Sequence, residues 1–79
     1  MNLTKEQIVQ RIKAVRSEKN LTQTQLAQLL GNSLRTVQSY ESGESRILLD
    51  TVTTIAYALG VTPAYLLGVS EPQIKLNTL

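Results

Sequence analysis

The sequence has 79 residues, 42% hydrophobic and 18% charged, with a formal net charge of +2. These values predict one small globular domain. The chain contains no cysteine or histidine, which excludes a disulfide framework and a thiolate metal site and removes the commonest general base. No apolar run approaches the roughly 18 residues of a membrane span, and no signal-peptide pattern opens the chain. We therefore expect a cytoplasmic protein with no membrane partner.

The first two predicted helices begin with the same capping pattern. Thr4 is followed three residues later by Gln7, and Thr22 is followed by Gln25. This is the spacing of a capping box, in which the threonine and glutamine side chains each bind a backbone N–H at the start of the helix. A helix is therefore predicted to follow each threonine.

Glycines and further caps bound the remaining helices. A glycine just past the last turn adopts the left-handed conformation without strain, and Gly31, Gly43, Gly60 and Gly68 each follow an apolar periodic segment. The expected starting positions are Asn32 or Ser33 for the third helix, Asp50 or Thr51 for the fourth, and Pro63 in the first turn of the fifth. We predict an all-α fold of five helices, near residues 5–18, 23–30, 34–42, 51–59 and 63–67.

The apolar residues of these helices predict the core. In the second helix the expected buried residues are Leu26, Ala27, Leu29 and Leu30, and in the third they are Val37 and Tyr40. The segment Tyr65-Leu66-Leu67 fits either the core or a partly exposed dimer contact. Periodicity is lost after Gly68, so we assign residues 1–68 to one domain and residues 69–79 to a tail or a truncated linker.

The second and third helices form the informative unit. Ala27 is small enough for two helices to cross closely, and Gly31 permits a tight turn between them. With Val37 and Tyr40 facing inward, the solvent side of the third helix has little role in the fold. It carries a guanidinium, an amide and hydroxyls, which are groups that can read the edges of bases in DNA.

The segment from Gln23 to Glu41, QTQLAQLLGNSLRTVQSYE, resembles the phage-repressor and Cro family of helix-turn-helix domains, which have the lambda-repressor-like fold. The resemblance extends from about Ile12 to Gly68 and includes RSEKNLTQ before this segment and ALGV after it. It implies a compact five-helix domain that binds double-stranded DNA through its third helix.

The resemblance also implies roles for individual residues. The positions that match base-contacting residues are Ser33, Leu34, Arg35 and Ser39, and we add Gln38, which fits a base, a phosphate or solvent equally. The positions that match phosphate-contacting residues are Thr22, Gln23, Ser42 and Arg46. Arg16 and Glu41 match a structural ion pair between the first and third helices.

Leu34 departs from the family pattern. Familiar members carry a glutamine at this position, which is braced by the glutamine at the position of Gln23. A leucine cannot make that hydrogen bond, so Leu34 either packs in the core or contacts a thymine methyl group. Arg35 likewise has two interpretations, a base contact or an ordinary solvated arginine. The loop from Glu44 to Leu49 differs from the family in acidity and length.

Two functions remain open at this point. The first is a transcriptional regulator, specifically a phage or bacterial repressor that binds a two-fold symmetric operator as a homodimer. The alternative is the same fold used as a protein-interaction module, such as an antitoxin or the target of an antirepressor, with weak DNA binding; the modest net charge favours it. We expect no enzymatic activity, metal or cofactor, because the carboxylates are scattered singly along the chain.

Overall fold

The computed structural model describes residues 3–69. Within that range it contains five helices and no strand, which confirms the predicted all-α class. The helices are α1 (Lys5–Glu18), α2 (Gln23–Leu30), α3 (Leu34–Ser42), α4 (Leu49–Leu59) and α5 (Pro63–Leu67). Four of the five have the predicted bounds. Of the predicted tail or linker, only Val69 is among the described residues.

The fourth helix begins two residues earlier than predicted. Its N-cap is Leu48, which makes no side-chain capping bond, and Asp50 lies inside the first turn. The prediction of an Asp50 or Thr51 cap was wrong because it required a side-chain oxygen at the helix start. Here the first turn is exposed, so water can satisfy its N–H groups, and the negative Asp50 is placed favourably near the positive end of the helix dipole.

The other helix boundaries follow the predicted chemistry. Thr4 and Thr22 both form complete capping boxes, and Ser33 caps α3 by accepting from the backbone of Thr36. The glycines after α2 to α5 all have φ between 72° and 81°, the left-handed region that side chains with a Cβ avoid. Sequence therefore determines where most of these helices stop.

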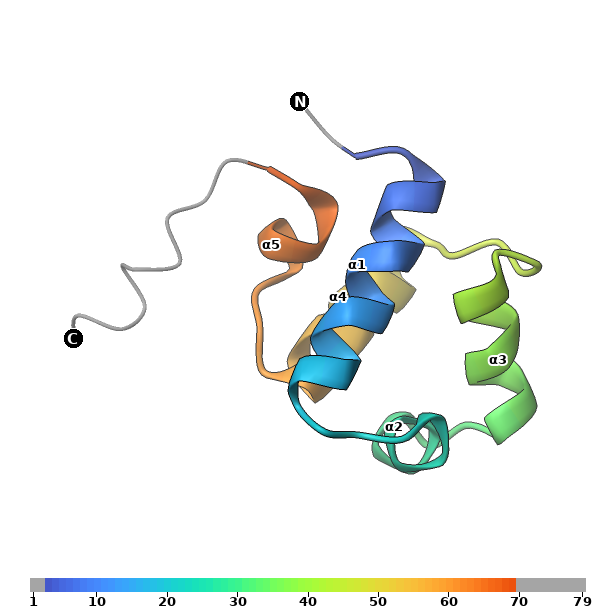
Figure 1. Ribbon diagram of the computed structural model, residues 1–79. Coiled ribbons are helices and arrows are strands. Elements are labelled where there is room, and N and C mark those ends of the chain that lie inside the picture. The colour runs from blue at the N-terminus through green and yellow to red at the C-terminus, as the bar shows by residue number, and fades with distance from the viewer. Residues whose placement is uncertain (1–2, 70–79) are drawn as a thin grey trace, which may run out of the picture.

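The core lies where α1, α4 and α5 pack together and where α2 and α3 close over one side (Figure 1). Leu66 is fully buried, whereas Tyr65 and Leu67 are half-buried against the core. Arg11 covers the Tyr65 ring, 4.9 Å from its centroid, and donates to the Tyr65 carbonyl. The fully or nearly buried hydrophobic residues are Val9, Ile12, Val15, Leu26, Ala27, Val37, Val52, Ile55, Ala56, Leu59 and Leu66.

Leu29 does not belong to the core, contrary to prediction. Its side chain is 58% exposed. A helix turns about 100° per residue, so the direction midway between the buried Leu26 and Ala27 is more than a quarter turn away from Leu29. The Leu30 side chain, in contrast, points between the directions of Leu26 and Ala27, and it is half-buried against the core.

The two ends of the described chain meet. The backbone N–H of Leu3 donates to the carbonyl of Leu67 at 3.0 Å, which places Leu3 beside the end of α5. The Leu3 side chain occupies the space that a Cβ on Gly68 would need. No helix within residues 3–69 is long and apolar enough to cross a membrane.

Candidate nucleic-acid interface

The turn between α2 and α3 is built from local backbone bonds. Gly31 has φ 72°, and the N–H of Asn32 donates back to the carbonyl of Ala27 at 2.9 Å. This pattern closes the last turn of α2, and the chain changes direction within the three residues that separate α2 from α3. Figure 1 shows the outcome: α3 stands at the side of the molecule, with α2 viewed almost end-on below it.

One side of α3 is buried and the other is free of the core. Val37 is 0% exposed and Glu41 is 5% exposed, so both face inward. Arg35, Gln38 and Ser42 are exposed, and Ser39 is half-buried. Leu34 is 40% exposed, which places it outside the core rather than in it.

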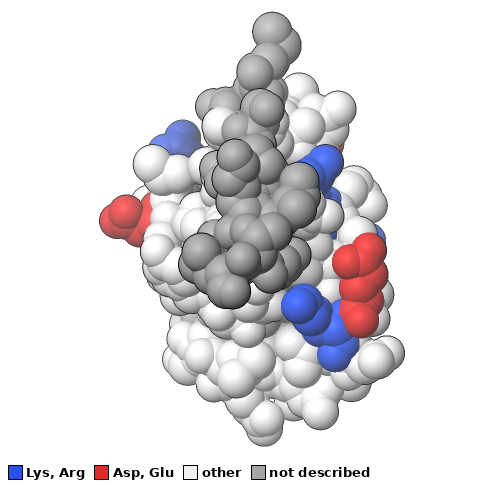
Figure 2. All heavy atoms as spheres, turned by 90° about the vertical axis from the view of Figure 1, so that its left-hand side faces the viewer, with Lys and Arg blue, Asp and Glu red and all other residues white. Residues whose placement is uncertain are grey.

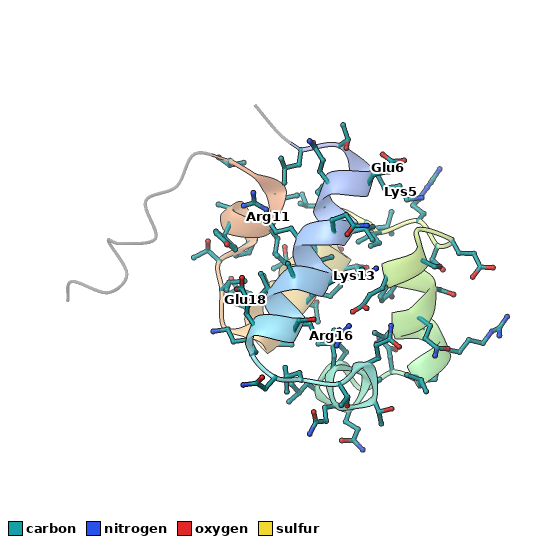
Figure 3. All side chains as sticks on the ribbon, viewed as in Figure 1. Lys5, Glu6, Arg11, Lys13, Arg16 and Glu18 are labelled. Atoms are coloured by element: carbon teal, nitrogen blue, oxygen red, sulfur yellow. The ribbon has the colours of Figure 1, made fainter. Side chains whose placement is uncertain are left out.

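A hydrogen-bond network fixes α3 to α1 and α2. Arg16 holds the Glu41 carboxylate with two bonds, from Nε to Oε2 at 2.7 Å and from Nη2 to Oε1 at 3.1 Å. Its Nη1 also donates at 2.7 Å to the carbonyl of Leu21, in the loop that precedes α2. Figure 3 shows Arg16 near the end of α1, beside α2. The Glu41 side chain is 3% exposed, so this carboxylate has exchanged water for these partners.

Gln23 joins the same network. Its Nε2 donates to Glu41 Oε1 at 2.9 Å. The family glutamine at this position braces the start of the third helix, but here the amide reaches a residue near the end of α3. The sequence did not reveal Glu41 as the partner of Gln23, because the two residues lie 18 positions apart and no local spacing connects them.

The hydroxyl groups predicted to contact DNA differ in the internal hydrogen bonds that they already make. Thr22 Oγ1 accepts from the Gln25 backbone, which leaves its own proton available. Ser33 Oγ lies 3.0 Å from Thr36 Oγ1. Ser42 Oγ donates to the Ser39 carbonyl at 3.2 Å, so a phosphate would have to displace that internal bond. The assignments of these residues to DNA stay predictions.

The loop after α3 brings an acidic residue to its outward face. Ser39 Oγ donates to Glu44 Oε1 at 3.4 Å. The site predicted from sequence omits Glu44, since a residue beyond a left-handed glycine no longer follows helical spacing. Arg46, further along the same loop, is exposed, and its phosphate contact stays a prediction.

Figure 2 shows the face of the molecule that is turned away from α3. The face of the molecule turned away from α3 carries few charged side chains outside the part covered in grey, and those visible lie toward its edges (Figure 2). Within residues 3–69 no three His, Cys, Asp or Glu residues gather as a metal site would require.

Comparison with known proteins agrees with this arrangement. A family model described as helix-turn-helix matches residues 12–66. The chain is 34% identical over 64 residues to a Sinorhizobium fredii protein named an uncharacterized HTH-type transcriptional regulator, y4wC. That alignment covers 81% of this chain and 45% of the relative, so the chain spans less than half of the relative's length.

A solved structure shows the same fold. The crystal structure of a hypothetical transcription factor, NHTF, from Neisseria superimposes with a TM-score of 0.76 at 27% identity, covering 95% of this chain and 84% of the other. The family match includes α2, the turn and α3 in full. The chain belongs to the helix-turn-helix family of the Cro and phage-repressor type.

Proposed function

We propose that this protein is a sequence-specific repressor that inserts α3 into the major groove of an operator. The observation that carries the proposal is the outward side of α3, where polar side chains that the core does not need lie together. Arg35 lies in the first turn of α3 on this surface. A guanidinium can donate two hydrogen bonds to O6 and N7 of guanine, a pair of acceptors that no other base presents. An α-helix with its side chains has about the width of the major groove.

The start of α2 supports contacts to the DNA backbone. Thr22 and Gln23 occupy this end of the helix, where backbone N–H groups without a helical partner favour a negative phosphate. Arg46 would add a positive charge from the loop after α3. Phosphate contacts of this kind set the register of the protein on the duplex, whereas contacts from α3 select the sequence.

Binding as a homodimer on a two-fold operator completes the proposal. One small domain reaches few base pairs, and two copies on half-sites about one helical turn apart double the specific contacts. The exposed apolar residues of α4 support a role for a second copy: Leu49 is 64% exposed and Tyr57 is 70% exposed. Neither side chain is used by the core.

Selection from a pool of random duplexes tests the proposal. We expect the protein to enrich an inverted repeat, and titration of the enriched duplex should show two protein chains per operator. A single enriched half-site would overturn the two-fold arrangement. Recovery of no preferred sequence would overturn the repressor function and favour the protein-interaction module.

A further inference from the structure

We infer that Glu44 is a positioning residue that makes Ser39 a hydrogen-bond acceptor toward DNA, so that Ser39 selects a base with an exocyclic amino group. This inference rests on the proposed function, because it assumes that α3 faces the major groove. It assigns a role to Glu44, an acidic side chain at a surface expected to approach a polyanion.

The backbone holds Glu44 against Ser39. The Ser39 carbonyl accepts from the N–H of Glu44 at 3.1 Å and from the N–H of Ser45 at 3.2 Å. It also accepts from Ser42 Oγ at 3.2 Å, and Ser42 Oγ in turn accepts from the N–H of Glu44 at 3.3 Å. The N–H of Glu44 therefore donates to two acceptors at the end of α3, the Ser39 carbonyl and Ser42 Oγ, and these two bonds hold the residue after Gly43 without using its side chain.

The direction of the side-chain bond follows from chemistry. An ionised carboxylate only accepts hydrogen bonds, so Ser39 Oγ must be the donor in its 3.4 Å contact with Glu44 Oε1. A serine hydroxyl has one proton and two lone pairs. Once the proton points to Glu44, the lone pairs are what Ser39 can offer to another group.

Ser39 also has the right place on the helix. It follows Arg35 by one turn, so the two side chains lie on the same side of α3. In the major groove, cytosine N4 and adenine N6 are donors, whereas guanine O6 and thymine O4 are acceptors. A hydroxyl that presents lone pairs favours the amino-bearing bases and disfavours the keto-bearing ones. A phosphate oxygen would meet no donor at Ser39 and would be repelled by the Glu44 carboxylate.

The test compares single variants on duplexes that differ at one base pair. For each of wild type, Glu44→Gln and Ser39→Ala, binding is titrated on four versions of the selected operator, one for each base at the position that Ser39 faces. We expect wild type to prefer cytosine or adenine there by about 2- to 10-fold, the value of one hydrogen bond. The base that is preferred identifies which amino group is read.

Glu44→Gln keeps the side-chain shape but lets the hydroxyl of Ser39 turn outward and donate. We expect the base preference to fall close to 1 while binding to all four duplexes tightens, because a negative charge has been removed. Glu18→Gln is the matched control: Glu18 is exposed at the end of α1, and its change in charge is the same. In that variant any tightening should be uniform and the base preference should stay intact.

The possible outcomes distinguish failure of this inference from failure of the proposed function. Ser39→Ala should lose the same preference as Glu44→Gln, and the double variant should lose no more than either single one. If both single variants keep the wild-type preference, Glu44 and Ser39 do not read this position and the inference is wrong. If wild type has no base preference at any position, the proposed function fails and the inference fails with it.

Discussion

Arg35 and Arg46 are both exposed arginines, yet their positions predict different effects on DNA binding. Arg35 lies in the first turn of α3, away from Val37, and Arg46 lies in the loop before α4. Base contacts distinguish sequences and phosphate contacts do not. The two residues therefore form an internal comparison between selectivity and affinity.

Arg35→Ala should weaken binding to the preferred operator by about 1–3 kcal/mol and relax selection at one base position in each half-site. Arg46→Ala should instead weaken binding evenly across sequences and lower the salt slope by about 1. Titration of both variants against operator and scrambled duplex distinguishes these effects. Equal weakening of both duplexes by Arg35→Ala would show that Arg35 is a phosphate contact.

Residue-level prediction from the sequence succeeded where spacing is local. The exposure of Arg35 and the inward position of Val37 follow from helical periodicity. The bond from Gln23 to Glu41 and the contact from Ser39 to Glu44 did not follow, because one joins different helices and the other crosses a helix end. The first depends on how α2 packs against α3, and the second depends on the path of the chain after α3 ends.

At the scale of elements, the Arg16–Glu41 pair holds α1 against α3. Replacing Arg16 by Met leaves a nearly buried carboxylate with only the Gln23 amide, and should destabilise the fold by about 3–5 kcal/mol. The double variant Arg16→Met/Glu41→Met removes both charges and should be less destabilised than either single one. Urea unfolding of the three variants measures this. Small and equal losses in all three would show that the pair is not important for stability.

The capping box of α2 uses glutamine where many such motifs use glutamate. Gln25→Glu should preserve the cap and the stability of the helix, since either residue completes the motif. It should nevertheless weaken DNA binding about fivefold, because two like charges 4 Å apart in water repel by about 1 kcal/mol. Gln7→Glu makes the same change in the box of α1, where Gln7 lines a surface cavity together with Arg11 and Tyr65, and should leave affinity unchanged. Equal binding by both variants would argue against phosphate at the start of α2.

Most elements could be predicted because their ends are marked by side-chain chemistry. Threonine and serine caps define the starts of α1, α2, α3 and α5, and left-handed glycines define the ends of α2 to α5. The start of α4 lacks such a mark, since Leu48 caps it without a side-chain bond. Leu29 was misplaced for a different reason: at about 100° per residue, its side chain points more than a quarter turn away from the direction of the buried Leu26 and Ala27.

At the scale of the whole molecule, electrostatics should govern affinity even though the net charge is small. If a dimer neutralises about 6–10 phosphates, affinity should fall by about 10³–10⁵ between 50 and 200 mM salt. Electrophoretic or fluorescence titration over that range provides the slope. A flat response would mean that the charge on this surface does not meet the DNA backbone.

The hydrogen bond from Leu3 to Leu67 bears on the connectivity of the chain. Because the two ends of the described chain already touch, a linker of a few residues could join residue 69 to residue 3 and give a backbone ring without moving a helix. Such a ring restricts the unfolded chain far more than the folded one, which favours folding. We therefore expect that a circularly permuted chain, with these ends joined and new ends opened in a loop, keeps the same five-helix fold.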